Sequence, residues 1–338
     1  MSYNPGHYET NGAAVDISNQ KVIWHIDHVI DNHAEKNASR VSDFLQFFLW
    51  AFRTRFADQG ISVKARLLFL LRTCLHPRLS LHWYAFLYHG YLRKAVQANG
   101  FLLDAIHRPF FDHQLPLPRR LGLLKNHFHL CQVFFGKVLA REILAGKAHE
   151  IAKFKGKNGE QFHLALFWGC TYKREGGLTL GLFLDGAILQ CLTFSFDRYK
   201  NDVAIKVGGI QASNHHSQES IRVATKALHG IQPRLLLIDA LRSLAAGVGC
   251  TSIECVAKRN HIYQAWRYKF SKNIRAEYDQ LWLAAGGTPH ANGNFILPLF
   301  VADKPVSSRP ANKRSEYRAR EGITHAMRSD ITVGLQTK

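Results

Sequence analysis

The segment from residue 221 to residue 270 constrains the fold most, because it predicts a turn, a long helix, a buried strand and a second helix in unbroken order. Gln232 is placed as the N-cap, and Pro233 occupies the first helical position, where its missing N–H costs nothing. Leucines then recur at helical spacing until Gly249, which is expected to end the helix. Residues 252–257 are rich in β-branched residues and mostly apolar, as a strand covered on both faces should be. We therefore expect a sheet with a helix packed against it.

The start of that helix also predicts a binding site for an anion. Backbone N–H groups at residues 231, 234 and 235 are expected to be free, and a helix N-terminus favours a negative charge by ~0.3–1 kcal/mol when exposed. Arg234 adds a cation at the same place. An ordinary capped core helix after a turn is the alternative that the residues leave open.

The charge of the chain indicates what such a site would bind. Lysine and arginine total 44 against 25 acidic residues, so the 338-residue chain has a net charge of +19 before its histidines are counted. Such a surface attracts polyanions, which include phosphate-bearing cofactors, anionic lipid and nucleic acid. Nucleic acid is the least expected of the three, because no recognised nucleic-acid-binding motif accompanies the basic residues.

The six cysteines are scattered without a CxxC pair, which favours a reducing compartment and argues against a disulfide framework or a zinc ribbon. The first residues show no secretory signal, and no apolar run approaches the ~18 residues of a spanning helix. We therefore expect a cytoplasmic protein that contacts the inner membrane only peripherally. Residues 1–40 are a polar extension that contains His25, His28 and His33; without an HExxH motif we expect no metal site there.

Residues 41–146 have the pattern of a basic helical region, with apolar clusters at helical spacing and basic residues between them. The clusters are Phe44, Phe47, Phe48 and Ala51, then Leu67, Leu68, Leu71 and Leu75, and the basic residues are Arg53, Arg55, Lys64, Arg66 and Arg72. A basic amphipathic helix can lie in the interface of an anionic membrane. The alternative is that these faces pack on one another within a helical subdomain.

Residues 147–303 change to a strand pattern and predict an α+β domain. The expected strands are 162–168, 178–184, 187–196, 203–207, 252–257 and 295–300, and beside the helix from Pro233 further helices are expected from Asn260 and over 274–285. Residues 304–338 are basic and contain proline and serine. We expect this C-terminal tail to be a partly ordered surface extension.

Several separate blocks resemble one family in the same order. They are SLHWYAFL (80–87), REGGLTL (174–180), LTFSF (192–196), VGGIQA (207–212), the segment 224–245, NHIYQ (260–264), YDQLW (278–282) and KRSEYRAR (313–320). Together they resemble the VirK/YbjX family of bacterial proteins, over most of the chain from about residue 60 to residue 325. The resemblance implies a Gram-negative bacterial protein associated with virulence, envelope properties and tolerance of cationic antimicrobial peptides. It implies no particular reaction.

The expected order of elements is similar, in addition, to the acyl-CoA transferases of the GNAT superfamily. The resemblance implies a GNAT-like mixed sheet flanked by helices after the helical N-terminal region, with acyl-CoA as the cofactor. In that fold the turn before the long helix holds the donor's pyrophosphate through backbone N–H groups, at positions that correspond to Gly230, Ile231, Gln232 and Arg234. Pro233 followed by Arg234 stands where the superfamily usually has a second glycine.

Acyl transfer requires a base, an acid for the leaving group and donors for the oxyanion. Glu175 is a candidate base, and a salt-bridged turn residue beside Arg174 is its alternative. His229 precedes the anion turn and is of the type suited to proton transfer, although a turn histidine capping a carbonyl fits equally. His261 and Tyr263 follow the buried strand, where diverging strands make room for a ligand, and Tyr263 is a candidate proton donor to a thiolate. An aromatic side chain wedged between helices is the alternative for Tyr263.

Two further residues are candidates for cofactor binding. Asn260 lies with the residues that follow the buried strand, and Lys226 lies upstream of the anion turn, where it could attract a phosphate group. The leading hypothesis is an acyltransferase-like protein that modifies, or supports modification of, an envelope component. The alternative is a non-enzymatic peripheral-membrane or regulatory protein that binds anionic lipid, an envelope precursor or a partner protein.

Overall fold

The computed structural model describes residues 41–57, 62–98, 100–168, 173–212, 218–266, 268 and 277–336. The polar extension with its histidines lies outside these residues. The start of the helix expected over 274–285 lies outside them as well.

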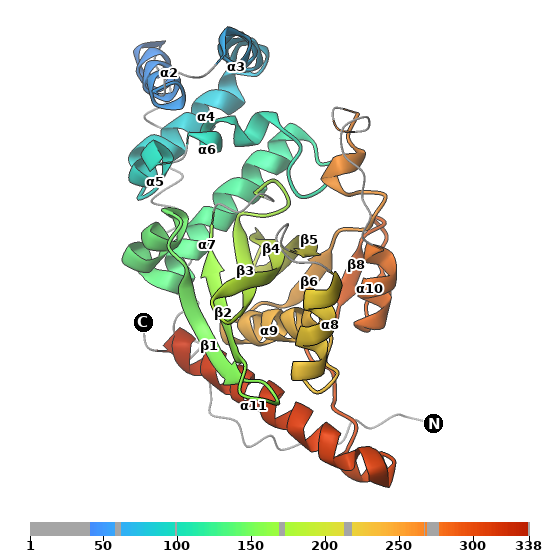
Figure 1. Ribbon diagram of the computed structural model, residues 1–338. Coiled ribbons are helices and arrows are strands. Elements are labelled where there is room, and N and C mark those ends of the chain that lie inside the picture. The colour runs from blue at the N-terminus through green and yellow to red at the C-terminus, as the bar shows by residue number, and fades with distance from the viewer. Residues whose placement is uncertain are drawn as a thin grey trace.

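The centre of the molecule is an eight-stranded mixed sheet with the strand order β1-β2-β3-β4-β5-β6-β8-β7 (Figure 1). Its strands are β1 (His149–Lys155), β2 (Gln161–Phe167), β3 (Leu178–Leu184), β4 (Ala187–Tyr199), β5 (Asp202–Ala212), β6 (Ser252–Cys255), β7 (Thr288–Pro289) and β8 (Phe295–Leu297). The first five strands form an antiparallel meander, and β5 and β6 are a parallel pair.

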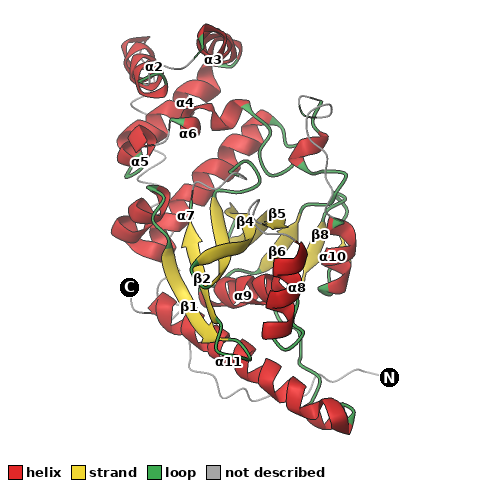
Figure 2. Ribbon diagram, viewed as in Figure 1, coloured by secondary structure: helices red, strands yellow, loops and turns green. Residues whose placement is uncertain are grey.

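Helices precede, interrupt and follow the sheet, as Figure 2 shows in red. The N-terminal helices are α2 (Val41–Arg55), α3 (Val63–Leu75), α4 (Pro77–His89), α5 (Arg93–Ala98), α6 (Phe101–Asp104) and α7 (Leu117–Leu144). The later helices are α8 (Gln218–Ala227), α9 (Pro233–Gly247), α10 (Tyr278–Ala284) and α11 (Arg314–Gln336), and the 3-10 turns are η1 (Ala105–His107), η2 (Ile262–Gln264), η3 (Val306–Ser308) and η4 (Ala311–Lys313). This confirms the expected α+β class, with a helical N-terminal region before a mixed sheet flanked by helices.

Helix α7 joins two hydrophobic cores. Its N-terminal half contributes Leu124 and Phe128 to a core built from α2 to α6, and its C-terminal half contributes Ala140 and Ile143 to the core of the sheet. Between the halves Gly136 has a φ of 71°, a conformation that glycine adopts without the steric cost of a side chain. The helical region and the sheet are therefore packed together through one kinked helix.

Helix α9 forms as the sequence predicts. Gln232 is its N-cap residue, Pro233 lies in its first turn, and Gly249, with a φ of 73°, follows its end. The side chains of Leu237 and Leu241 are fully buried in the sheet core, because the helix packs against β3, β4 and β6. The local signals of the caps and the apolar face agree with the tertiary packing here.

The structure differs from the expected secondary structure at several places. No α-helix begins at Asn260; the chain instead makes η2, in which His261 is the N-cap and accepts a hydrogen bond from the backbone of Tyr263. The last expected strand ends at Leu297 rather than at residue 300. Strand β1 was not expected, since its short alternating pattern lies among charged residues.

The C-terminal tail is also corrected, because α11 is a helix of 23 residues rather than a partly ordered extension. Ile323, Met327 and Ile331, each four residues apart, are buried in the sheet core. Figure 1 shows α11 along the lower edge of the molecule, where it packs on β1 and α9. Arg328 donates two hydrogen bonds to Asp239 of α9. The tail therefore completes the core on the side of β1.

Candidate functional site

Strands β5 and β6 separate near the middle of the sheet. They pair in parallel from Ala204 and Ser252 to Val207 and Cys255, and the last link is a hydrogen bond from the N–H of Val256 to the carbonyl of Val207. Beyond this point β5 continues along β4, with a bulge at Gly208 of β5 opposite Thr193 and Phe194. The divergence that the sequence predicted after β6 is therefore present.

Glu175 occupies this divergence, and two glycines of β5 allow it to approach. A Cβ atom on Gly208 would lie 1.7 Å from the carbonyl oxygen of Glu175, and one on Gly209 would lie 2.2 Å from its Oε2. The side chain of Glu175 is 0% exposed. The paired glycines of the VGGIQA block therefore make room for a buried carboxyl group.

Four side chains surround that carboxyl group. Gln211 donates from Nε2 to Oε1 at 2.6 Å, and Thr193 donates from Oγ1 to Oε2 at 3.2 Å. Nε2 of His261 lies 3.5 Å from Oε1, and Tyr263 also hydrogen-bonds to the carboxyl group. Burial raises the pKa of Glu175 above its ordinary value, and the contacts with His261, Thr193 and Tyr263 offset part of that rise.

The orientation of His261 follows from its other nitrogen. Nδ1 accepts a hydrogen bond from the backbone N–H of Tyr263 at 3.3 Å, so the proton of the neutral ring is assigned to Nε2, on the side of Glu175. The ring stacks on Tyr278 at a centroid distance of 5.2 Å and meets the Tyr263 ring edge-on at 4.9 Å. His261 is fully buried, whereas Tyr263 is half-buried. Tyr263 is thus more exposed than His261 and Glu175.

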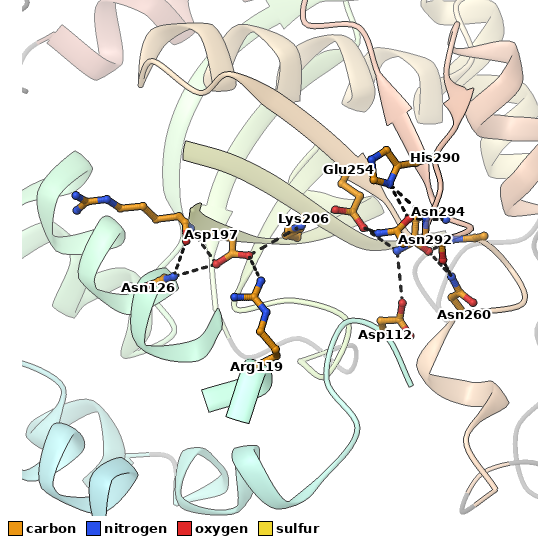
Figure 3. Close-up of polar contacts among 12 residues, drawn as sticks. Asp112, Arg119, Asn126, Asp197, Lys206, Glu254, Asn260, His290, Asn292 and Asn294 are labelled. Carbon is orange, nitrogen blue, oxygen red and sulfur yellow. Dashed lines mark hydrogen bonds and ion pairs between the residues drawn. The ribbon is translucent and has the colours of Figure 1, made fainter. Parts of the chain in front are cut away.

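Asn260 belongs to a second polar network, shown in Figure 3. It donates from Nδ2 to Oδ1 of Asn294 at 2.8 Å, and Asn294 in turn donates to Oε1 of Glu254 at 2.7 Å. Asn292 donates to the same oxygen of Glu254 at 2.8 Å, and the second oxygen is paired with Lys206. Burial works to raise the pKa of Glu254, but Lys206 and the two asparagines outweigh it and hold the pKa below its ordinary value. The role of Asn260 in this structure is to support that network.

The same network reaches the helical region. Asn294 donates to Asp112 at 3.4 Å, and Lys206 lies 3.9 Å from Asp197. Asp197 also accepts from Asn126 of α7 at 3.0 Å and lies 3.8 Å from Arg119. Sequence reasoning missed these residues, and the signals that could have identified them are a glutamate inside the apolar strand β6 and the asparagine-rich turn before β8.

The turn before α9 differs from the expected anion cradle. The N–H of Ile231 is donated to the carbonyl of Leu228, and the N–H of Leu235 is donated to the carbonyl of Gln232. The expectation that these two groups are free is therefore wrong, because the turn and the first helical turn use them internally. The backbone arrangement does not fit a pyrophosphate cradle at these two positions. Arg234 is exposed and donates to the side chain of Gln232 at 2.9 Å.

Helix α11 covers this turn. Arg320 donates from Nε to the carbonyl of His229 at 2.5 Å, and a Cβ atom on Gly230 would lie 2.5 Å from Nη2 of Arg320. Lys226 is exposed on α8. His229, Gly230 and Lys226 are therefore not part of the cluster around Glu175, and the structure brings together Glu175, His261 and Tyr263 from the predicted catalytic set.

A cleft of about 250 Å³ lies beside the first turns of α9. Its lining residues come mainly from α9, α11 and the segment between β8 and α11: Ile231, Leu235, Leu236, Asp239, Arg242, Val301, Asp303, Lys304, Arg309, Tyr317, Arg320, Glu321, Thr324 and Arg328. The guanidinium carbons of Arg309 and Arg320 lie 4.1 and 4.6 Å from the ring centroid of Tyr317, respectively. Binding of a phosphate-bearing donor near residues 230–235 stays a prediction. The groups available to bind such a donor are side chains of the cleft, because the backbone N–H groups of Ile231 and Leu235 are used within the turn.

Two further observations concern metal binding and membrane crossing. Within the described ranges, no cluster of three or more histidine, cysteine or acidic side chains is arranged to hold a metal ion. Over the same ranges, no helix combines the length and the apolar character that crossing a membrane requires.

Comparison with known proteins identifies relatives but no reaction. Residues 58–332 match the family model described as protein of unknown function DUF535. The Escherichia coli K12 protein YbjX, described as uncharacterised, is 31% identical over 268 residues, which cover 78% of this chain and 81% of that protein. An uncharacterised Haemophilus influenzae protein is 28% identical over 273 residues, covering 76% of this chain and 88% of that protein. The resemblance seen in the sequence blocks is thereby confirmed.

Among solved structures, the chain is similar to a cAMP-binding acyltransferase from Mycobacterium smegmatis at 9% sequence identity. The TM-score is 0.28, and the match covers 70% of this chain and 65%, just under two thirds, of that one. A likeness this weak supports no argument about the chemistry of the chain.

Proposed function

We propose that this chain, which belongs to the DUF535 family of proteins of unknown function, transfers an acyl group, with Tyr263 and Glu175 handling the proton and His261 positioning Glu175. The observation that carries the proposal is the buried Glu175–His261 pair at the divergence of β5 and β6, in contact with a half-buried tyrosine hydroxyl. A buried carboxyl group with a raised pKa beside a histidine and a tyrosine is typical of sites of proton transfer.

The three residues have different roles in this proposal. Tyr263 is the catalytic residue, since it is the least buried of the three and can touch a ligand. The acceptor's nucleophile attacks the acyl carbon, and its proton passes through the Tyr263 hydroxyl to the buried Glu175 carboxylate. The donor's leaving group takes a proton from the Tyr263 hydroxyl, which recovers one from Glu175. His261 is a positioning residue, because its Nε2 lies 3.5 Å from the Glu175 carboxyl group and its ring is held by the backbone of Tyr263.

The reaction class and the acceptor rest on different grounds. Acyl transfer is supported by the order of elements, a meander followed by a helix and a parallel strand, which is similar to the GNAT superfamily. An envelope component as the acceptor, and a contribution to virulence or antimicrobial-peptide tolerance, are suggested by the family resemblance. Acyl-CoA is a donor to be tested, and no step above depends on it.

A thermal-shift titration of the purified protein tests the proposal first. We expect acyl-CoA of some chain length to stabilise the protein beyond tripolyphosphate, with a shift that rises as RT ln(1 + [L]/Kd). Transfer to an amine or hydroxyl acceptor should then be lost in Tyr263→Phe, which keeps the ring, and be retained in Tyr199→Phe at an exposed position. An equal response to every polyanion, or transfer that survives Tyr263→Phe unchanged, would overturn the proposed function.

A further inference from the structure

Helix α3 exposes a continuous row of apolar side chains. Val63, Leu67, Leu71 and Leu75 are each four residues apart, and they are 71%, 60%, 54% and 63% exposed. Successive positions four apart lie on the same side of a helix, so these side chains form one stripe along α3. Cys74 beside them is also exposed.

Helix α2 extends this apolar surface at the same end of the molecule. Leu45 and Leu49 of α2 are 51% and 47% exposed. In Figure 1, α2 and α3 lie together at the top, at the end opposite α11. Aromatic rings connect the inner sides of the two helices. The ring centroid of Phe69 in α3 lies 6.4 Å from that of Phe52 in α2 and 5.5 Å from that of Phe56, which directly follows α2.

The two faces of α3 differ in their packing. Phe69 is buried, so one face of α3 does pack inside the helical region. Leu67, Leu71 and Leu75 do not pack there, which leaves the leucine side of the helix open to solvent. We call the set Leu45, Leu49, Val63, Leu67, Leu71 and Leu75 the leucine surface. An apolar surface of this extent on a folded chain marks an interaction site.

The charged side chains around the α3 part of the leucine surface are all positive over a long stretch of sequence. Between Asp58 and Asp104 the chain contains neither aspartate nor glutamate. The cations in this interval are Lys64, Arg66, Arg72, Arg78, Arg93 and Lys94. Of these, Lys64 and Arg78 are exposed and lie within α3 and at the start of α4.

We propose that the leucine surface docks on a lipid bilayer that contains anionic headgroups, with α3 lying in the plane of the interface. Leucines on one side with lysine and arginine around them are the arrangement of interfacial helices, which insert the apolar side and attract acidic headgroups with the rest. The 13 residues of α3 span only about 20 Å, too short for the ~30 Å hydrocarbon layer, so the helix lies on the membrane.

The charge argues against a second copy of the chain as the occupant. A symmetric contact through the leucine surface would bring the cations of one copy against those of the other, and like charges disfavour such an interface. A bilayer with anionic lipid supplies both the apolar layer and the opposite charge.

Vesicle sedimentation tests the proposal with the full-length protein. We expect binding to vesicles of phosphatidylcholine and phosphatidylglycerol in equal parts, and much weaker binding to phosphatidylcholine alone. The double variant Leu67→Gln and Leu71→Gln should lower the partition coefficient at least about tenfold, because both leucines lose their transfer into the apolar layer. The variant Leu283→Gln, at a position of α10 that is 54% exposed, should bind as the unchanged protein does.

The electrostatic part has its own variant. Lys64→Gln with Arg78→Gln should weaken binding to anionic vesicles and reduce its salt dependence, since surface attraction falls with the Debye length. Circular dichroism should show the same melting temperature for all variants, because the substituted side chains are exposed.

Three outcomes would overturn the proposal. They are failure of the unchanged protein to bind anionic vesicles, equal binding by the leucine variant, and a dimer in light scattering that the leucine variant dissociates. The result is separable from the acyl-transfer proposal, since Tyr263→Phe should bind vesicles as the unchanged protein does.

Discussion

Oε1 of Glu175 lies 3.5 Å from Nε2 of His261, and neither side chain is exposed to solvent. The two residues come from different parts of the chain, the loop before β3 and the segment after β6. They meet because Gly208 and Gly209 leave space for the loop that contains Glu175. The charge of this carboxyl group is therefore tied to the integrity of the fold.

A pH-dependent contribution of Glu175 to stability follows from its raised pKa. Burial raises that pKa above the ordinary value of 4.5, so the folded state favours the protonated form. The contribution is fully present below pH 4.5 and is lost as the pH rises through the raised pKa. We expect the free energy of unfolding of the unchanged protein, relative to Glu175→Gln, to fall with rising pH by at most about 1.4 kcal/mol per pH unit.

Urea unfolding of both proteins across the acidic to neutral range checks this. Glu321→Gln, at an exposed position, is the matched control and should give a flat difference. A flat difference for Glu175→Gln as well would show that the carboxyl group is not buried as described.

Gly208→Ala should be among the most destabilising single substitutions in the sheet. Its Cβ would lie 1.7 Å from the carbonyl oxygen of Glu175, a backbone atom that cannot rotate away. We expect a loss of at least about 3 kcal/mol in the free energy of unfolding, from strain in a packed interior. Gly122→Ala in α7, where nothing lies within 4 Å, should instead gain about 0.5–1 kcal/mol from helix propensity. Chemical denaturation measures the free energy of unfolding of both variants. Equal values for the two would contradict the close approach of Gly208 to the Glu175 backbone.

His127 should make the fold sensitive to acid. It is buried between α7 and β4, where its Nδ1 accepts from the N–H of Phe196 at 3.1 Å, and burial lowers its pKa from 6.5 to about 3. As the pH falls below 6.5, His127 is therefore protonated in the unfolded chain but stays neutral in the folded one. Stability is present above that pH and is lost as the pH falls towards 3, by roughly 2 kcal/mol at pH 5.

The slope of the free energy of unfolding against pH separates the effect of His127 protonation from the effect of its packing. His127→Asn should lower stability at every pH, yet its decline between pH 6.5 and pH 5 should be shallower than that of the unchanged protein. His325→Gln, at an exposed position of α11, should leave the slope unchanged. An unaltered slope in His127→Asn would assign the acid sensitivity to other groups.

Helix α11 should contribute to global stability rather than to the surface alone. Met327 is 0% exposed in the sheet core, so Met327→Ala should cost about 2–5 kcal/mol through lost burial and the cavity left behind. Val333→Ala, at a position of the same helix that is 55% exposed, should change the free energy of unfolding by less than about 0.5 kcal/mol. If Met327→Ala and Val333→Ala both changed the free energy of unfolding in urea by similar small amounts, α11 would not be packed against the sheet core.

Local signals predicted a substantial part of this fold. The N-cap Gln232, the proline after it and the terminal Gly249 marked α9 closely, and β3 has the bounds expected from its apolar pattern. The same signals failed for the tail, where Ile323, Met327 and Ile331 are sparse among basic residues. Their importance depends on β1 and α9, which lie far away in the sequence.

The candidate site was predictable only as a set of separate residues. Glu175, His261 and Tyr263 were each named from their neighbours in the sequence, but no periodicity indicates that a loop before β3 reaches the segment after β6. The asparagine network around Glu254 was missed for the same reason, since each of its amides is an ordinary turn residue until the fold brings it to a buried carboxylate.

The sequence by itself determined the α+β class, the family and the position of α9, because caps, turns and periodicity act between residues a few positions apart. Only the tertiary structure decided which polar groups share a buried environment and which apolar face stays open. The N–H of Ile231 is used within its own turn, Glu175 meets His261, and Leu67 faces solvent while Phe69 does not. Burial and pairing depend on what packs against a residue, and that is set by contacts between distant segments.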